Sequence, residues 1–307
     1  MTDLIIIGGG PAGVSGSVYA TRKHLETVLI AEEIGGQSTV SERIENWIGT
    51  PNVSGADLGK MLRSHLDVLN KDLITLSIGE RAVSLVRSSE GFSVQTKSGK
   101  GFPAKAVLIA SGASRRKLDV PGAEKFNNKG ITYCASCDGP LFAGMDVAII
   151  GGGNAGFETA LQLLGYAKSV TLIHRHEEFK ADPITVEKVL ANPNMRAIRN
   201  AEPIEVIGEQ FVTGFKYRMK DSGEVKMLEV SGIFVEAGVI PNTDFAEKLV
   251  EFDAVKRVKI DPRNQRTSVE GIWAAGDCTD ELYHQNNIAA GDGVKALEDI
   301  YLWIKKQ

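Results

Sequence analysis

The chain has 307 residues, of which 43% are hydrophobic and 24% charged, and its formal net charge is −4 at pH 7. This length accommodates two domains with separate cores, and the composition is that of a globular protein. The mild acidity and the lack of any Lys/Arg-rich block argue against a nucleic-acid partner. No apolar stretch approaches the ~20 residues of a membrane-spanning helix, so no membrane association is expected.

The chain contains three cysteines, an odd number and too few for a disulfide scaffold. The apolar run at residues 4–7 lacks a basic segment before it and leads directly into glycines, which indicates a strand rather than a signal peptide. We therefore expect a cytoplasmic protein, in which a close pair of cysteines is typically catalytic or metal-binding.

The chain opens with a strand, a glycine loop, a helix and a second strand. The β-branched run at residues 4–7 predicts a buried parallel strand, followed by a helix from about 13 to 23 and a strand at 27–31. The loop between them is a dinucleotide-binding fingerprint, in which glycines form the turn, admit a pyrophosphate and let the helix pack. Its residues are Gly8, Gly10, Pro11, Ala12 and Gly13. Glu32 stands where an acidic residue would bind an adenine ribose.

The same plan returns in the middle of the chain. A strand at 146–150, a helix from about 155 to 165 and a strand at 169–174 are predicted around a second glycine loop. Its fingerprint residues are Gly151, Gly153, Asn154, Ala155 and Gly156. Two such loops imply two nucleotide sites and hence two redox cofactors.

Two strands end in small or turn-forming residues and predict crossings between domains. They are the strands at 106–110 and 232–237. The last residues, which finish in a helix expected over 293–306, are too few for a third nucleotide-binding domain. We predict an α/β protein with two Rossmann-like three-layer (ββα) nucleotide-binding domains, the second inserted into the first. The first comprises residues 1–113 and 244–307, and the second comprises 114–243.

A Cys134-Ala-Ser-Cys137 motif lies in the second predicted domain. Cysteines at this spacing can close into a small disulfide, and one thiolate can be stabilised by its neighbour. A zinc site would need two further ligands; Cys278 is alone and the histidines are scattered, so no metal is expected and Cys278 is predicted to be buried and inert. Asp138 could exchange a proton with the leaving thiolate, or it could be a turn residue before Gly139-Pro140.

These motifs resemble those of low-molecular-weight thioredoxin reductases and of the reductase core of the flavoprotein subunit of bacterial alkyl hydroperoxide reductase. The resemblance runs from about residue 3 to the C-terminus, and its most specific block is Tyr133-Cys-Ala-Ser-Cys-Asp-Gly139. The other matching blocks are Gly8–Gly13, Gly35-Gly36-Gln37, Glu45-Asn46-Trp47, Gly151–Glu158, Gly238–Asn242 and Ala275–Cys278. Glutathione reductase is less similar, because it carries its cysteine pair in the first domain.

The resemblance implies FAD in the first domain and NAD(P)H in the second. It implies that Cys137 faces the flavin, that Cys134 attacks the disulfide of the partner, and that Asp138 acts as acid and base. It further implies a homodimer, with thioredoxin as the first expected partner and a glutaredoxin-like or peroxiredoxin-linked carrier as the second. No thioredoxin-like extension precedes the first glycine loop, so the carrier is expected to be a separate protein. The residues expected near the flavin are Gly36, Gln37, Asn46, Gly112, Gly276, Asp277 and Gln285.

The chain departs from the family pattern at the segment expected to hold the 2′-phosphate of NADPH. Members that use NADPH have His-Arg-Arg and a further Arg, whereas this chain has His174-Arg175-His176, then two glutamates and Lys180. A histidine is mostly neutral at pH 7, and a charged hydrogen bond contributes roughly 1.5–3 kcal/mol, so each loss costs about tenfold. NADPH is the first expectation, with NADH or dual use close behind. His284 and Asn286-Asn287 are further departures.

The leading hypothesis is an NAD(P)H-dependent flavoenzyme that reduces a protein disulfide through Cys134 and Cys137. A ferredoxin-fed flavin thioredoxin reductase is one alternative, favoured by the thinned basic cluster. A small-molecule dithiol oxidase is another, although it would not need the second glycine loop. A non-enzymatic FAD-binding module is disfavoured by the Cys-Ala-Ser-Cys-Asp-Gly block.

Overall fold

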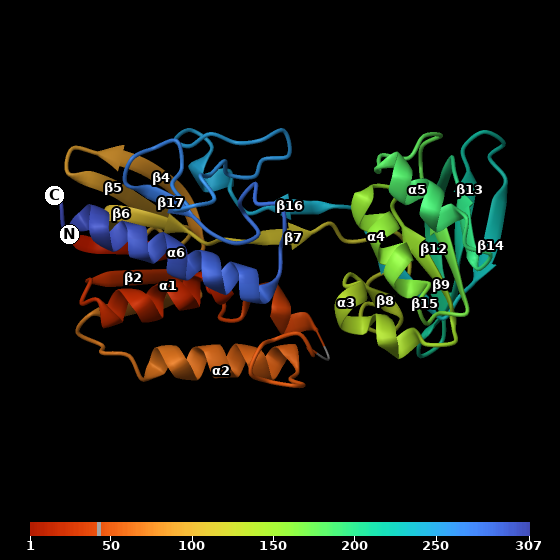
Figure 1. Cartoon of the computed structure of the whole chain (residues 1–307), viewed down its shortest axis with the longest axis horizontal. Coiled ribbons are helices and arrows are strands. Elements are labelled where there is room, and N and C mark those ends of the chain that lie inside the picture. Colours follow the sequence, from red (N-terminus) through yellow and green to blue (C-terminus); the bar gives the residue numbers. More distant parts are fainter. Residues whose placement is uncertain (42–43) are drawn as a thin grey trace. The chain divides into compact units, whose positions relative to one another are not determined.

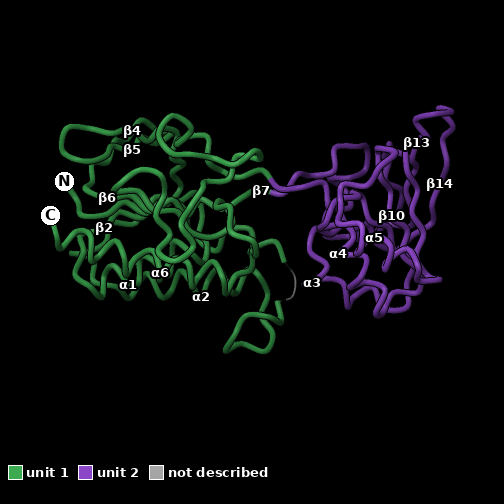
Figure 2. The backbone as a smooth tube through the Cα atoms, turned by 45° about the horizontal axis from the view of Figure 1, so that its top comes forward, with its two compact units in different colours: residues 1–114, 240–307 green, residues 115–239 purple. Residues whose placement is uncertain are grey.

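The computed structural model of the chain describes residues 1–41 and 44–307. Its contacts divide it into two compact units, which Figure 2 colours separately. Unit 1 comprises Met1–Ser114 and Ile240–Gln307, and unit 2 comprises Arg115–Val239. Within the described ranges, no helix combines the length and the apolar character needed to cross a bilayer.

Unit 1 is built on a seven-stranded sheet in the order β3-β2-β1-β6-β5-β4, with β17 beside the second half of β6 (Figure 1). β3, β2, β1, β6 and β17 are parallel, whereas β4 and β5 extend the sheet as an antiparallel meander. The strands are β1 (Thr2–Ile7), β2 (Thr27–Ala31), β3 (Ile74–Ile78), β4 (Ala82–Ser88), β5 (Gly91–Thr96), β6 (Gly101–Ile109) and β17 (Ile272–Ala274).

The two faces of β1 contribute to two different cores. Leu4 and Ile6 pack in a cluster with residues of α1 (Pro11–Arg22) and α6 (Asn286–Ile304). Ile5 and Ile7 instead pack with residues of β4 and β5. A strand buried on both faces needs apolar residues throughout, which explains the continuous apolar run in the sequence. Helices, parallel strands and antiparallel strands thus form three layers. The remaining helices of unit 1 are η1 (Gly36–Val40), α2 (Gly55–Asp67) and η3 (Asp244–Ala246).

Unit 2 repeats this plan around a five-stranded parallel sheet in the order β11-β10-β9-β15-β8. One face packs against α4 and α5, and the other packs against the antiparallel sheet β12-β13-β14. The predicted class, two three-layer α/β units with the second inserted into the first, is confirmed. The elements are β8 (Ile131–Thr132), α3 (Ala135–Asp138), η2 (Gly139–Phe142), β9 (Asp146–Ile150), α4 (Asn154–Leu163), β10 (Ser169–Ile173), α5 (Pro183–Leu190), β11 (Met195–Ile198), β12 (Ala201–Gly208), β13 (Val212–Met219), β14 (Val225–Glu229) and β15 (Gly232–Val235).

The two segments that connect the units are short strands that pair with each other. They are β7 (Ala113–Arg115) and β16 (Val239–Pro241). The backbone N–H of Arg116 donates to the carbonyl of Gly238 over 3.0 Å, and that of Asn242 donates to the carbonyl of Gly112 over 3.0 Å. The chain therefore leaves unit 1 and returns to it through one paired ribbon.

The last helix begins seven residues earlier than the sequence predicts. It runs from Asn286 to Ile304 rather than over 293–306. Gly293 suggested a helix start, but it lies inside the helix at the crossing with α1. A Cβ atom there would stand 2.2 Å from the carbonyl oxygen of Ala12 and 2.4 Å from Oγ of Ser15. The glycine is needed for close packing of the two helices, which local sequence does not reveal.

This crossing gives a paired test of packing against helix propensity. Gly293→Ala should lower the free energy of unfolding by about 1–3 kcal/mol, because the added methyl group overpacks the contact with α1. Gly291→Ala in the same helix should raise it by about 0.5–1 kcal/mol, because the structure places no described atom outside the local helix backbone within 4 Å of that Cβ. Urea denaturation of both variants measures the difference, and equal effects would contradict the packing argument.

Candidate dinucleotide and dithiol sites

The first glycine loop uses its glycines for two different purposes. Gly8 has φ +120°, and a Cβ atom on it would lie 2.1 Å from the carbonyl oxygen of Ala110. A Cβ on Gly13 would lie 1.8 Å from the carbonyl oxygen of Gly8. Gly10, in contrast, meets no atom of the described residues within 4 Å. The protein's own backbone requires the outer two glycines, whereas the middle one borders open space that a ligand can enter.

The second loop repeats this division. A Cβ on Gly151 would lie 2.2 Å from the carbonyl oxygen of Glu236, and one on Gly156 would lie 2.0 Å from that of Gly151. The nearest atom to a Cβ on Gly153 is the carbonyl oxygen of Lys180, at an ordinary 3.7 Å. The middle glycine is again the one that the fold itself does not need.

Both loops end at a helix N-terminus that suits a phosphate. Gly10 caps α1 and Gly153 caps α4, and in the described structure neither cap provides a side-chain hydrogen bond. The first turns, Pro11-Ala12-Gly13 and Asn154-Ala155-Gly156, carry no charge. The free N–H groups and the helix dipole are therefore available to an anion. The residues present fit the pyrophosphate of a dinucleotide in each unit.

Further predicted residues gather around the first loop. A Cβ on Gly36 would lie 3.2 Å from Cα of Gly10, and one on Gly276 would lie 3.3 Å from Cβ of Ala12. Asp277 follows Gly276 and is half-buried, and no hydrogen bond or ion pair within residues 1–41 and 44–307 engages its carboxylate. Glu32 follows β2 and is exposed, with Arg81 3.8 Å away.

Gln285 and the first two residues of α6 connect the start of that helix to Asn46 and Ser38. Nδ2 of Asn46 donates to Oε1 of Gln285 over 3.2 Å, and Nδ2 of Asn287 donates to the carbonyl oxygen of Asn46 over 2.6 Å. Oγ of Ser38 donates to Oδ1 of Asn286 over 2.7 Å. The two asparagines that depart from the family pattern thus connect this edge of unit 1. Gln37 is exposed, and Gly112 has φ +64°.

The cysteine pair is closed into a disulfide in unit 2. The Cα atoms of Cys134 and Cys137 are 5.3 Å apart, and both residues are half-buried. The short helix α3 holds them, because the N–H groups of Cys137 and Asp138 donate to the carbonyl oxygen of Cys134. The pair is redox-competent and partly accessible.

Thr132, which the sequence did not single out, bridges Asp138 and Cys134. Its hydroxyl donates to Oδ2 of Asp138 and accepts the backbone N–H of Cys134 over 3.3 Å. Thr132 is the last residue of β8, so the sheet fixes the carboxyl group beside the first cysteine. Nothing in the sequence marks this threonine, since its partners are set by the turn between strand and helix.

The glycine of the Cys-Ala-Ser-Cys-Asp-Gly block has a packing reason. A Cβ on Gly139 would lie 2.0 Å from Oη of Tyr166. That hydroxyl is buried, and among the described residues it has no hydrogen-bond partner. Burial raises the pKa of Tyr166. The glycine therefore lets the buried hydroxyl group of the half-buried Tyr166 pack directly against the redox segment.

Cys278 differs from Cys134 and Cys137 in burial and in oxidation state. It is fully buried and free, and its thiol donates to the carbonyl oxygens of Ile109 and Ala275. Burial raises the pKa of its thiol to about 11. The described residues contain no group of three His, Cys, Asp or Glu side chains that could hold a metal ion.

The histidine that follows β10 is not part of an outward-facing basic cluster. His174 is buried, its Nδ1 accepts the N–H of Gly152 over 3.2 Å, and its Nε2 lies 2.9 Å from the carbonyl oxygen of Glu178. Burial lowers the pKa of its imidazole, which favours the neutral form. His174 therefore supports the second glycine loop from beneath, and the sequence-based role in phosphate binding does not fit its position.

The remaining residues of that segment carry balanced charge. Arg175 and Lys180 are exposed cations, and Glu177 and Glu178 are exposed anions. Nε of Arg175 donates to Nε2 of His176 over 3.0 Å. Desolvation, followed by the charges of Arg175 and Lys180, lowers the pKa of His176. The segment thus offers two cations, Arg175 and Lys180, where the family pattern for NADPH has three arginines.

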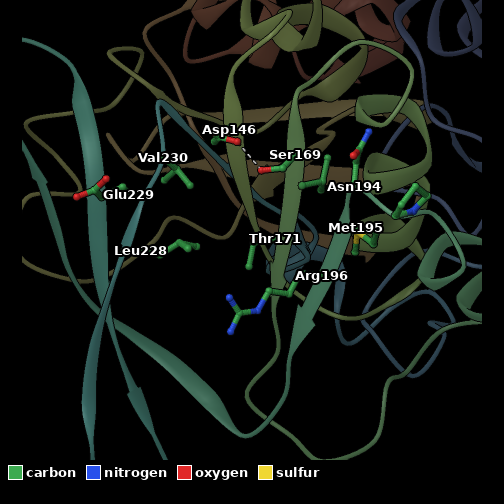
Figure 3. Close-up of a pocket in the computed structure, with 11 residues that line it drawn as sticks. Asp146, Ser169, Thr171, Asn194, Met195, Arg196, Leu228, Glu229 and Val230 are labelled. Carbon is green, nitrogen blue, oxygen red and sulfur yellow. Dashed lines mark hydrogen bonds between the residues drawn. The ribbon is translucent and has the colours of Figure 1, made fainter.

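A pocket in unit 2 lies at the end of the parallel sheet where β9 and β10 begin, opposite the end where the second glycine loop follows β9 (Figure 3). Asp146 and Ser169, the first residues of β9 and β10, line it and share a 2.6 Å hydrogen bond. Ligands of doubly wound sheets bind at the carboxyl ends of the strands. This pocket is therefore separate from the candidate nucleotide site.

Comparisons with known proteins agree with this geometry. A family model described as pyridine nucleotide-disulphide oxidoreductase matches residues 2–293. One alkyl hydroperoxide reductase component, from Staphylococcus aureus (strain NCTC 8325 / PS 47), is 40% identical over 302 residues, 98% of this chain and 59% of the relative. NADH dehydrogenase of Bacillus subtilis (strain 168) is 38% identical over 294 residues, 96% of this chain and 57% of the relative. The chain thus spans a little under three fifths of the length of these relatives.

Solved structures of thioredoxin reductases are similar over the whole chain. The enzyme from Giardia duodenalis has a TM-score of 0.91 at 30% identity and covers 99% of both chains. The enzyme from Streptococcus pyogenes MGAS5005 has a TM-score of 0.89 at 31% identity and covers 100% of this chain and 99% of its own.

The two kinds of glycine predict two kinds of defect. The free energy of unfolding of Gly10→Ala should lie within about 1 kcal/mol of the wild-type value, because the added methyl group meets open space. The variant should nevertheless bind flavin nucleotide more weakly. The free energy of unfolding of Gly13→Ala should be lower than that of the wild type by about 3 kcal/mol or more, because the added methyl group collides with the backbone at Gly8. Flavin retention on purification and the urea midpoint separate the two outcomes; a stable, flavin-replete Gly13→Ala would contradict the assignment.

Proposed function

Since the chain belongs to the pyridine nucleotide-disulphide oxidoreductase family, we propose that it is a flavin-dependent disulfide reductase. Electrons enter from a reduced nicotinamide dinucleotide and leave through Cys134 and Cys137 to a disulfide of thioredoxin or a thioredoxin-like protein. The observation that carries the proposal is a closed, half-buried cysteine pair in the same chain as two glycine loops with open middle glycines.

FAD is proposed for unit 1 and the nicotinamide dinucleotide for unit 2. The loop from Gly8 to Gly13 and the N-terminus of α1 would hold the FAD pyrophosphate, and Glu32 would hold its adenine ribose. Asp277, Asn46 and Gln285 would line the rest of the site. When bound, the flavin supplies a ring that accepts hydride from the nicotinamide and gives two electrons to a disulfide.

The chain's own cysteines perform the exchange with the partner. Reduction of the Cys134–Cys137 disulfide gives two thiols. The thiolate of Cys134 then attacks one sulfur of the partner's disulfide, which forms a mixed disulfide and releases the other sulfur as a thiolate. Cys137 then attacks the sulfur of Cys134, which frees the partner as a dithiol and closes the internal disulfide again. Asp138, held by the hydroxyl of Thr132, is placed to move the protons that these steps require.

Two sets of relatives support two related partners. The similar solved structures are thioredoxin reductases, which supports thioredoxin. The relatives that are components of alkyl hydroperoxide reductase support a second candidate, a thioredoxin-like carrier that feeds a peroxidase. A cytoplasmic homodimer is proposed in either case. The open Gly153 favours nicotinamide use over supply by ferredoxin.

We propose NADH as the preferred donor, with NADPH also accepted. His174 is buried, and His176 accepts a hydrogen bond from Arg175 and has a lowered pKa. The two exposed glutamates repel a 2′-phosphate, whereas the ribose of NADH does not carry this dianionic group.

Replacing each cysteine separates the two half-reactions. In Cys134→Ser and Cys137→Ser, anaerobic NADH should still bleach the flavin absorbance, while reduction of thioredoxin falls by about 10³-fold or more. Cys278→Ser, the matched control outside the redox pair, should keep both activities because its thiol is buried and neutral. If reduced ferredoxin bleaches the wild-type flavin and neither nicotinamide does, nicotinamide use is wrong.

The coenzyme preference can be tested at one position. His176→Arg should raise kcat/KM for NADPH by about tenfold, since it adds a charged hydrogen bond to the 2′-phosphate. It should leave kcat/KM for NADH within about threefold. Steady-state kinetics with both donors on wild type and variant measure this. A wild type that prefers NADPH by more than an order of magnitude would contradict the proposal.

A further inference from the structure

The strand order in the parallel sheet of unit 2 reverses between β9 and β15. From β9 the chain passes to β10 on one side, whereas β15 lies on the other side of β9. Dinucleotides bind across the carboxyl edge of a sheet at such a switch point, with the pyrophosphate at the loop after the central strand. The adenosine half then lies beyond β10, near Arg175. The nicotinamide half lies on the side of β15, and the residue that follows β15 is Glu236.

Glu236 directly borders the second glycine loop. Its backbone N–H donates to the carbonyl oxygen of Ile150, the last residue of β9, over 2.8 Å. Its own carbonyl oxygen is the atom that excludes a Cβ on Gly151. Its side chain is held from the other side, because Oγ1 of the buried Thr159 on α4 donates to Oε1 over 2.8 Å. No described residue donates a hydrogen bond to the second carboxyl oxygen, Oε2.

The surroundings of Glu236 make its charge costly. Burial is the largest effect and raises the pKa of this carboxyl group to about 6. Arg115 on β7 opposes the rise and Glu158 on α4 adds to it, whereas β9 and the loop contribute only apolar residues and glycines here. A glutamine would make the same hydrogen bond with Thr159 without that cost. A half-buried acid at this edge, with one carboxyl oxygen that no described residue engages, points to a ligand rather than a structural partner.

We propose that Glu236 binds the nicotinamide half of the dinucleotide and that its carboxylate favours the oxidised coenzyme, NAD⁺, over NADH. The inference rests on the proposed function of unit 2. The nicotinamide ring is a cation in NAD⁺ and neutral in NADH, so a poorly solvated carboxylate nearby attracts only the former. The same oxygens can accept hydrogen bonds from the carboxamide N–H groups of either form.

This charge preference links binding to protons. NAD⁺ favours the ionised carboxylate, so its affinity should rise as the pH increases through about 6, where Glu236 loses its proton. ADP-ribose, which shares the adenosine half and lacks the nicotinamide, should not report on Glu236, although it does report on any titration of His176.

Calorimetric titration of the holoenzyme with NAD⁺ and ADP-ribose, neither of which can reduce the flavin, from pH 5 to pH 8 tests the inference. In the wild type, NAD⁺ should bind about fivefold or more tightly at pH 8 than at pH 5, and its binding near pH 6 should release protons. In Glu236→Gln this pH dependence should disappear while ADP-ribose affinity stays within about twofold. Glu229→Gln, which removes an exposed charge of the same unit beside the pocket at the opposite edge, should behave as the wild type.

The outcomes distinguish the inference from the function on which it rests. If Glu236→Gln keeps the wild-type dependence of NAD⁺ affinity on pH, the role of Glu236 is overturned and nicotinamide use stands. If wild-type protein binds neither NAD⁺ nor ADP-ribose, the proposed function fails first. Should Glu236→Gln not fold, Glu236→Asp keeps the acid on a shorter side chain, and it should retain the pH dependence with smaller amplitude; an unchanged amplitude overturns the inference.

Discussion

In both units a backbone carbonyl presses against the α-carbon of the glycine that ends the central strand. Ala110 supplies this carbonyl in unit 1 and Glu236 supplies it in unit 2. The contact is possible only without a side chain, and it brings the end of a neighbouring strand against the start of the loop. The loop, the helix that follows it and the open middle glycine all take their positions from this approach. A nucleotide site is thus a consequence of how closely two strand ends can pack.

The same constraint connects the nucleotide loops with the chemistry around them. In unit 2 the carbonyl belongs to a residue whose side chain carries a half-buried acid. In the redox segment, Gly139 admits the hydroxyl group of Tyr166 in a similar way, and the preceding residue, Asp138, accepts a hydrogen bond from Thr132. Backbone packing therefore decides which side chains face the ligands, and the reactive groups need few contacts of their own.

The sequence predicted those parts of the fold that depend on short-range order. The strands at 27–31 and 146–150 are confirmed to the residue, because a β-branched run bounded by glycine or charge leaves little choice. The first helix starts at Pro11 rather than near Gly13, since proline is well suited to the first helical position. The start of α6 was wrong because Gly293 serves a contact with Ala12 and Ser15, near the other end of the chain. Tyr166 and Glu236 escaped notice because their partners are likewise distant in the sequence, whereas Thr132 did so because a local turn sets its contacts. The cofactor roles assigned to the loop residues stay predictions.

His174 is next to Arg175 in the sequence, but it faces the interior of unit 2 rather than the surface. Its ring is locked between the amide of Gly152 and the carbonyl of Glu178, so the loop geometry depends on it. Arg175, His176 and Lys180, the three residues proposed to face the adenine ribose, are exposed or half-buried and have no such contact in the interior. Substitutions at these positions can therefore change the charge offered to a coenzyme, while the imidazole beneath keeps the backbone of the loop in place.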